Sequence, residues 1–129
     1  MVASHLMDSN VLIDYASGKF SGAAGLKLDG IFNESFHYSI LSRMEVLGYN
    51  APIEVLQNME EFLSTGIMIY VTDEICNRTI SVRRSLPKIK LPDAIIAATA
   101  IVHSLTLLTR NTSDFKNVIG LSLINPWEE

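Results

Sequence analysis

Short apolar runs alternate with longer amphipathic segments along the chain. Five of the apolar runs have the length and composition of buried strands and cover residues 1–7, 36–40, 67–72, 105–109 and 121–124. The segments between them have helical periodicity, which predicts helices at 11–16, 23–33, 41–48, 53–65, 74–86 and 93–103. Strands and helices that alternate through short connections are typical of an α/β domain with a mainly parallel central sheet.

Polar side chains gather after the predicted strand 105–109. Ahead of this strand, Pro92 starts an alanine-rich helix, so that Asp93 falls in its first turn, at the positive end of the helix dipole. The polar residues that follow the strand are Arg110, Asn111 and Asp114. If residues 112–115 form a helical turn, the last two fall on the same side of it. Ligands of open α/β sheets bind beyond the carboxyl ends of the strands, so these positions are candidates for a functional site.

Two more carboxylates have both a structural and a functional interpretation. Asp8 follows the first predicted strand, together with Ser9 and Asn10, and could either cap the next helix or point into a cleft. Glu45 lies off the apolar stripe of the helix 41–48 and, taken alone, is expected to face solvent. From these residues alone, both interpretations stay open.

Two helices carry more apolar side chains than one buried stripe requires. On the helix 41–48 the stripe is formed by Leu41, Met44, Leu47 and Gly48. On the helix 53–65 the apolar residues are Ile53, Val55, Leu56, Met59, Phe62 and Leu63. Part of this surface, at Met59 and Phe62 for example, is expected to stay exposed for a partner.

The composition favours a compact globular protein. With 129 residues, of which 48% are hydrophobic and 19% charged, the chain is expected to fold as one domain over 1–129. No apolar run approaches the length of a membrane span and no signal-peptide pattern opens the chain, so no membrane association is expected. The one cysteine, Cys76, is expected to be a small buried residue and fits a reducing, cytoplasmic environment. Residues 1–6 could alternatively be an addition from cloning ahead of Met7.

Basic residues are concentrated in one segment, although the net charge of the chain is −4. Between Ile75 and Pro92 there is no acidic residue, and the basic residues are Arg78, Arg83, Arg84, Lys88 and Lys90. This segment has two interpretations. It is either a solvated helix face or a flank that contacts phosphate groups beside an acidic, metal-charged cleft.

Four pieces of sequence occur in register with those of a known family. They are D-S-N-V-L-I-D-Y at 8–15, S-R-M-E-V-L-G-Y at 42–49, L-P-D-A-I-I-A-A-T-A at 91–100 and L-L-T-R-N-T-S-D-F at 107–115. Together with G-L-S-L-I-N-P-W at 120–127, they resemble the PIN-domain nucleases, and above all the VapC-type ribonuclease toxins of prokaryotic toxin–antitoxin pairs. The resemblance spans nearly the whole chain and implies a three-layer α/β/α domain.

The resemblance also implies which residues form the catalytic site. The first three acidic residues of the family correspond to Asp8, Glu45 and Asp93, with Ser9 and Asn10 as polar support. Many relatives carry a fourth acid directly after the Thr-Arg pair, and here that position is Asn111. Asp114, three residues further on, resembles the acidic residue of a T-R-N-x-x-D-F variant of the motif and is expected to replace it.

A cluster of carboxylates has a chemical reason in such a nuclease. Mg²⁺ and Mn²⁺ prefer oxygen ligands, and one or two of these cations can activate water and stabilise charge during phosphodiester hydrolysis. Carboxylates without a cation would repel one another, so the cluster predicts a metal site. The resemblance therefore implies a Mg²⁺- or Mn²⁺-dependent endoribonuclease with an RNA substrate, a VapB-type antitoxin and a homodimeric state. RNA contacts are expected from the five basic residues above and from Arg110.

Four other kinds of protein remain to be weighed. A catalytically degenerate PIN domain, serving as a protein- or RNA-binding module, is favoured by the neutral Asn111. A receiver is disfavoured, because neither an acidic pair near the first strand nor a late lysine is apparent. A phosphatase is disfavoured, because Asp8 is followed by Ser9-Asn10 and so does not begin a D-x-D motif. A metal-free ribonuclease needs a general acid–base pair, and His37 and His103 form no paired motif.

Overall fold

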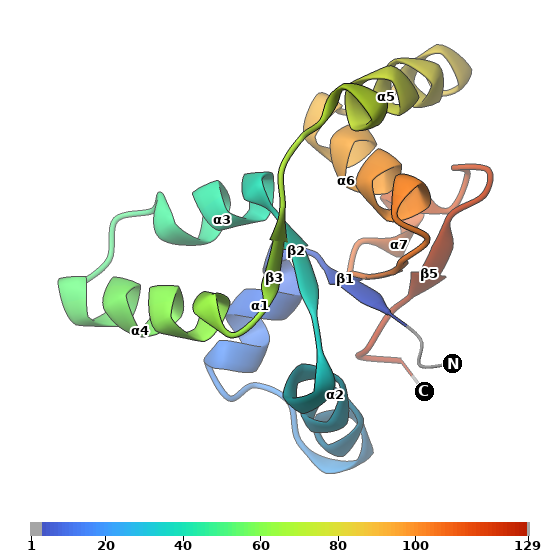
Figure 1. Ribbon diagram of the computed structural model, residues 1–129. Helices are drawn as coiled ribbons and strands as arrows, with labels where there is room; N and C mark the ends of the chain where they lie inside the picture. The colour runs from blue at the N-terminus through green and yellow to red at the C-terminus, as the bar shows by residue number, and fades with distance from the viewer. Residues whose placement is uncertain (1–3, 129) are drawn as a thin grey trace.

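Five short parallel strands form the central sheet (Figure 1). They are β1 (His5–Met7), β2 (His37–Ser39), β3 (Ile67–Ile69), β4 (Thr106–Leu108) and β5 (Ser122–Ile124). The strand order is β3-β2-β1-β4-β5, and each neighbouring pair is parallel. The computed structural model describes residues 4–128. Residues 1–3, which begin both the first predicted strand and the segment 1–6 interpreted as a cloning addition, lie outside the described residues.

Seven helices connect and cover the strands in the described part of the chain. They are α1 (Ser9–Ala16), α2 (Gly22–Glu34), α3 (Ile40–Leu47), α4 (Ile53–Ser64), α5 (Asp73–Ser85), α6 (Leu91–Val102) and α7 (Thr112–Phe115). The six helices predicted from periodicity are thus confirmed to within two residues at each end, and the turn at 112–115 is helical. The strands are shorter than predicted. β3, for example, ends before Thr72, because the Thr72 hydroxyl caps α5 by accepting a hydrogen bond from the Ile75 N–H.

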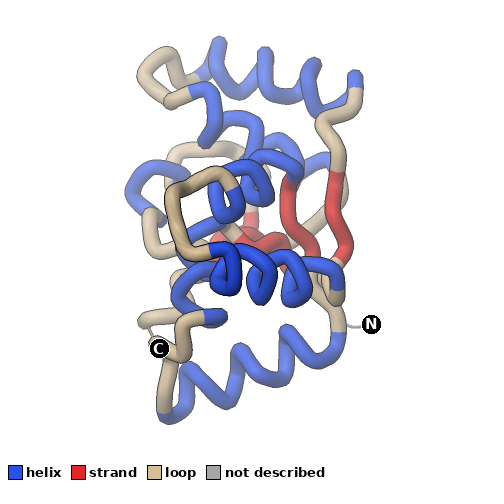
Figure 2. Tube along the Cα trace, turned by 90° about the vertical axis from the view of Figure 1, so that its left-hand side faces the viewer, coloured by secondary structure: helices blue, strands red, loops and turns tan. Residues whose placement is uncertain are grey.

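Alternate residues of the strands belong to two hydrophobic cores, which lie on opposite faces of the sheet. Leu6 and Leu107 belong to the core beneath α5, α6 and α7, where α6 contributes buried alanines. Met7 and Leu108, the next residue in each strand, belong to the core beneath α1, α2, α3 and α4. Figure 2 shows the strands in the middle of the molecule with helices above and below them. The predicted three-layer α/β/α architecture is therefore confirmed.

The strand order creates a switch point beside β1. From β1 the chain continues to β2 and β3 on one side, and then crosses to β4 and β5 on the other. The carboxyl ends of β1 and β4 therefore meet where the strand order reverses, which is where open α/β sheets bind ligands. His37 begins β2 and His103 precedes β4, so both histidines lie towards the opposite, amino-terminal edge of the sheet.

One prediction of burial is wrong, and the apolar residues of α3 and α4 divide between surface and core. Cys76 is exposed, because the buried face of α5 is formed by Ile75, Thr79 and Val82. Met44 is 57% exposed, because α3 turns Ser42 and Val46 towards the core. Met59, expected at the surface, is 7% exposed and belongs to the core beneath α4, whereas Phe62 is partly buried against that core.

No helix within residues 4–128 combines the length and the apolar character that a membrane crossing requires.

Candidate active site

Asp8 is held rigidly where β1 ends and α1 begins. Its Oδ1 accepts a hydrogen bond of 2.9 Å from the Ser9 N–H, so Asp8 caps α1. Its Oδ2 accepts hydrogen bonds from the Thr109 hydroxyl at 2.8 Å and from the Asn10 amide at 3.3 Å. Asp8 is only 8% exposed. The capping interpretation is therefore confirmed, and the same contacts fix the carboxylate at the switch point.

Asn10 and Thr109 join the ends of β1 and β4. The Asn10 amide donates to Thr109 Oγ1 at 3.3 Å, and Asn10 Oδ1 accepts from the Arg110 N–H at 3.1 Å. Thr109 Oγ1 also accepts from the Asn111 N–H at 3.1 Å. Thr109 is fully buried and was not among the candidate site residues. Its place in the T-R-N piece, directly after an apolar strand, is the sequence signal that could have identified it.

Glu45 and Asp93 approach Asp8 from different helices. Glu45 is exposed on α3, as expected, and Asp93 is half-buried in the first turn of α6. Burial and then the charge of Asp8 raise the pKa of Glu45, and the nearby Ser9 hydroxyl acts in the opposite direction. Burial, the charge of Asp114 and the charge of Asp8 raise the pKa of Asp93. The charge of Asp8 thus acts on both Glu45 and Asp93, and the charge of Asp114 acts on Asp93.

Burial also raises the pKa of Asp8, although its three hydrogen bonds act against the shift. The principal causes that act on Asp8, Glu45 and Asp93 are thus desolvation and repulsion, both of which disfavour the charged form. Among the groups that shift these three pKa values, the sole cation is Lys90, which lowers the pKa of Asp93. Within the described residues, Lys90 therefore offsets part of the negative charge at Asp93, whereas no cation is among the groups that shift the pKa of Asp8 or Glu45.

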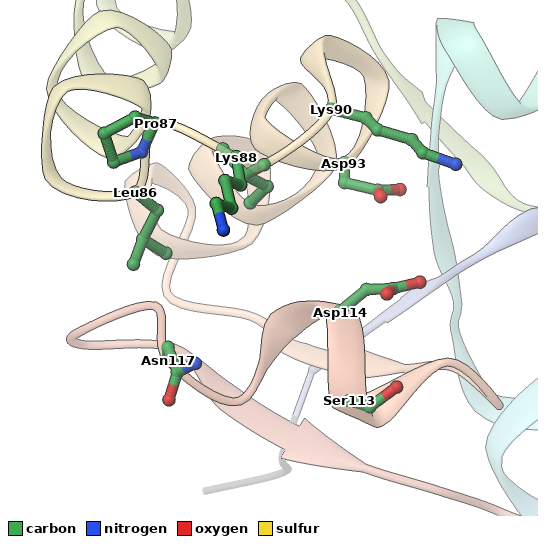
Figure 3. Close-up of a pocket in the computed structure, with 9 residues that line it drawn as sticks. Leu86, Pro87, Lys88, Lys90, Asp93, Ser113, Asp114 and Asn117 are labelled. Atoms are coloured by element: carbon green, nitrogen blue, oxygen red, sulfur yellow. The ribbon is translucent and has the colours of Figure 1, made fainter.

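Asp114 joins the same edge from α7. Figure 3 shows the carboxylates of Asp93 and Asp114 directed into a common space, with the Lys90 side chain extending past Asp93. Both acids line a pocket of about 480 Å³ between α7 and the loop that precedes α6. The buried ring of Phe115 anchors α7 in the core. Asn111 occupies the N-cap position of α7 but forms no side-chain cap, and it is exposed.

We call the side chains of Asp8, Glu45, Asp93 and Asp114 the acidic edge. Its donors are all carboxylate oxygens, the ligand type that Mg²⁺ and Mn²⁺ prefer, and excess negative charge favours such a cation. Within residues 4–128, no group of three or more histidine, cysteine, aspartate or glutamate side chains lies in an arrangement that could hold a metal ion. Mg²⁺ does not require such a group, because it usually keeps several waters and takes one or two carboxylates from the protein.

The predicted RNA-contacting residues lie in three different environments. Lys88 and Lys90 line the pocket beside Asp93 and Asp114. Arg78 lines a separate hollow of about 210 Å³ next to Val118 and Ile119. The remaining basic side chains of α5, Arg83 and Arg84, are exposed in its last turn.

Arg110, by contrast, belongs to a second carboxylate centre. Its guanidinium pairs with the carboxylate of Asp14, which is 6% exposed on α1. Lys19 Nζ lies 3.6 Å from the other Asp14 oxygen, and Arg110 Cζ lies 4.3 Å from the ring centre of Trp127. We call these four residues the Asp14 cluster. The apolar helix V-L-I-D-Y-A signals it, because an aspartate three residues after Val11 shares the buried face and needs a cation.

Comparisons with known proteins agree with this geometry. The PIN domain family matches residues 6–121 of the chain. A segment of 36 residues is 53% identical to the VapC ribonuclease Y4jK of Sinorhizobium fredii, and it covers 28% of this chain and 25% of that protein. The matched part is thus about a quarter of that relative's length.

Solved structures extend the similarity to almost the whole chain. A chain of the toxin–antitoxin complex from Klebsiella pneumoniae matches with a TM-score of 0.79 and 34% identity, over 98% of this chain and 100% of that one. DNA-bound VapBC from Salmonella typhimurium matches with a TM-score of 0.83 over 97% and 99% of the two chains, and at 19% identity supports the fold alone. Because the family match spans residues 6–121 and the Klebsiella pneumoniae chain is 34% identical over nearly its full length, the chain belongs to the PIN-domain family, as its resemblance to VapC-type members implied.

Proposed function

We propose that this chain is a Mg²⁺- or Mn²⁺-dependent endoribonuclease that acts as the toxin of a toxin–antitoxin pair. The observation that carries the proposal is the gathering of Asp8, Glu45, Asp93 and Asp114 near the switch point, where Lys90 is the one cation among the described residues that opposes the raised pKa values. Membership of the PIN-domain family and the VapC ribonuclease relative support the same chemistry.

Each part of the acidic edge has a distinct task in this proposal. Asp8 supplies a fixed carboxylate, because its three hydrogen bonds prevent it from turning away. Asp93 and Asp114 supply oxygens from α6 and α7, and both residues line the pocket. Glu45 extends from α3 and can accept a hydrogen bond from an attacking water. A divalent cation, when bound, would activate that water and stabilise charge on the phosphate.

Asn10, Thr109 and Asn111 act as supporting groups in this proposal. Asn10 and Thr109 orient the Asp8 carboxylate through their hydrogen bonds. Asn111 is neutral and can hydrogen-bond a bound water, whereas the full charge at the fourth place comes from Asp114. The expected cation ligands are accordingly Asp8, Glu45, Asp93 and Asp114.

Cleavage of RNA tests the proposed chemistry directly. Attack by water should leave 5′-phosphate and 3′-hydroxyl ends, and excess EDTA should abolish the reaction. Attack by the ribose 2′-hydroxyl would instead leave a 2′,3′-cyclic phosphate. Cleavage that persists in EDTA and produces cyclic phosphate would refute a metal-activated water.

A catalytically degenerate PIN domain that only binds RNA or protein is the second candidate function. The neutral Asn111 at the fourth acidic place is the observation that favours it. This alternative predicts RNA binding without cleavage and no response to Mn²⁺. Metal-dependent turnover of RNA by the purified protein would exclude it.

We further propose that a VapB-type antitoxin covers the apolar surface around α4, and that the toxin itself is a homodimer. The exposed apolar residues of this surface are Met44, Tyr49, Ile53 and Val55. A hollow of about 600 Å³, to which Tyr49, Val55 and Phe62 contribute, lies between α4 and the segment around α1. An amphipathic helix of the antitoxin could bury this surface, as in other helix-in-groove complexes. The matched Klebsiella pneumoniae structure is itself a toxin–antitoxin complex.

Substitution of an exposed residue tests this surface more cleanly than one at the buried Met59. Val55→Asp should weaken binding of the cognate antitoxin, because it places a charge in an apolar interface. Leu26→Asp, at an exposed position on α2, is the matched control. Equal binding of wild-type protein and of a folded Val55→Asp variant would remove this surface from the interface. The molar mass by sedimentation tests the homodimer.

A further inference from the structure

The pocket beside Asp93 and Asp114 continues beyond the acidic edge into a chemically mixed region. Its other walls combine apolar, polar and cationic side chains, which are Leu86, Pro87, Ile89, Ser113, Asn117, Lys88 and Lys90. Figure 3 shows Asp93 and Asp114 at one side of this space, with Leu86, Lys88 and Asn117 around the other. The pocket volume of about 480 Å³ lies within the range of typical small-molecule sites. The acidic edge is therefore continuous with a space large enough for a nucleoside.

We propose that this part of the pocket is a nucleobase subsite. It receives an unpaired base of the RNA adjacent to the phosphodiester that is cut at the acidic edge, and Asn117 determines which base is preferred. This inference rests on the proposed ribonuclease function, because the position of the scissile phosphate defines the neighbouring base. It adds a determinant of specificity that lies outside the carboxylates themselves.

The residues that line the pocket can contact both the flat face and the hydrogen-bonding edge of a nucleobase. Leu86, Pro87 and Ile89 offer apolar contact to its flat face, while the Asn117 amide can donate and accept hydrogen bonds at its edge. Within residues 4–128, the Asn117 side chain takes part in none of the hydrogen bonds of the folded chain. Proteins recognise unpaired RNA bases by this combination of face contact and edge hydrogen bonds.

The charges around the pocket select a nucleotide over other occupants. Lys88 and Lys90 line the same pocket as Asp93 and Asp114, Lys88 towards the apolar wall and Lys90 past Asp93 (Figure 3). Neither lysine forms a salt bridge within the described residues. A plain anion would be repelled by Asp93 and Asp114, and a plain cation by the two lysines. A nucleotide is compatible with both kinds of charge, because its phosphate can contact the lysines and also a metal ion bound at the acidic edge.

Cleavage of short single-stranded RNAs that vary at the positions flanking the cut tests the subsite. We expect wild-type protein to prefer one base at a flanking position, and Asn117→Ala to reduce that preference by about 5- to 100-fold, the size of one well-paired base contact. Cleavage of the disfavoured sequences should stay near the wild-type rate. Asn77→Ala, at an exposed asparagine of α5 outside the pocket, is the matched control.

Binding of nucleoside 5′-monophosphates in Mg²⁺, followed by NMR, provides a readout that does not depend on turnover. The Asn117 side-chain amide should shift on binding, Asn117→Ala should equalise the affinities of the four nucleotides, and Lys88→Ala should weaken all four alike. A wild-type protein that cleaves RNA without a flanking preference, or an Asn117→Ala variant that keeps it, would overturn the subsite alone. If wild-type protein cleaves no RNA, the proposed function fails, and the subsite then stands or falls on whether a nucleotide shifts Asn117.

Discussion

A buried aspartate lies near each end of α1, and the two differ in whether the folded chain supplies a cation to pair with the carboxylate. Asp14 is 6% exposed and is neutralised from within the chain by Arg110 and Lys19. Asp8 is 8% exposed and receives only neutral hydrogen bonds, while its charge raises the pKa values of Glu45 and Asp93. A buried carboxylate without a cationic partner is costly to keep charged. The Asp14 cluster is thus complete as a structure, whereas the acidic edge requires charge from outside.

The largest expected effect is the loss of RNA cleavage at the acidic edge. Asp93→Asn keeps the shape of the side chain but removes a proposed metal ligand, so we expect activity to fall far more than about 100-fold, the upper range for supporting groups. Asp73→Asn is a matched control, since Asp73 is also an aspartate in the first turn of a helix but is exposed. The measurement is single-turnover cleavage across Mn²⁺ concentrations, with folding checked by thermal melts.

Substitutions at Asp114 and Asn111 show which of the two residues contributes more to cleavage at the fourth acidic place. Asp114→Asn should be severely impaired, because it removes a full charge that faces Asp93. Asn111→Ala should lose about 10- to 100-fold, as expected for a group that orients its neighbours. A folded Asp114→Asn protein that cleaves at the wild-type rate would leave a centre of three carboxylates. Loss of activity in Asn111→Ala as complete as in Asp93→Asn would instead make Asn111 a direct ligand.

The same isosteric substitution should change stability in opposite directions in the two regions. Asp14→Asn should lower the free energy of unfolding by about 2 kcal/mol, because it weakens charged hydrogen bonds at a buried position while leaving Arg110 partly solvated. Without divalent cations, Asp93→Asn should instead raise the free energy of unfolding, because it removes a charge that is partly desolvated and repelled by Asp114 and Asp8. Glu60→Gln controls for loss of an exposed ion pair, which contributes little. Denaturant unfolding of the three variants measures the difference, and equal signs for Asp14→Asn and Asp93→Asn would contradict it.

A smaller effect is the pH dependence of stability. The pKa values of Asp8, Glu45 and Asp93 are raised above their ordinary values of 3.8, 4.5 and 3.8. Because the folded chain holds these protons more tightly, the resulting stability is fully present below the ordinary values and is lost as the pH rises through the raised ones. Without divalent cations, the free energy of unfolding of wild-type protein relative to Asp93→Asn should therefore fall as the pH rises through this window. Unfolding curves that show no such fall would mean that burial and neighbouring charges do not raise the pKa of Asp93 in the folded state.

Much of the architecture could be predicted from the sequence, because it depends on local patterns. Alternating residues such as Leu107 and Leu108, on opposite faces of β4, set the sheet between two helical layers. The motif residues Asp8, Glu45, Asp93 and Asp114 could be named in advance and lie at one edge, whereas their roles as ligands stay predictions. That residues 1–129 form one domain also stays a prediction.

The features that sequence reasoning missed depend on packing between distant segments. Arg110 was expected at the RNA, but Asp14, far away in sequence, pairs with its guanidinium and Trp127 lies against it. Thr109 is buried by the contact between β1 and β4, which periodicity alone cannot reveal. Met59 was expected at the surface but is buried, because the apolar pattern of α4 alone does not show which of its faces meets the core. On α3, the buried face in fact includes Ser42.

The central claim is that the acidic edge binds a divalent cation, whereas the Asp14 cluster is neutralised by Arg110 and Lys19 and binds none. A thermal melt of wild-type protein across Mn²⁺ concentrations tests it most directly. Binding to the folded state alone should stabilise the protein by about 2.7 kcal/mol at a concentration one hundred times Kd. We predict this stabilisation for wild-type protein and for Asp73→Asn, and its loss in Asp93→Asn. Absence of stabilisation in wild-type protein, or an equal response in a folded Asp93→Asn variant, would contradict the claim.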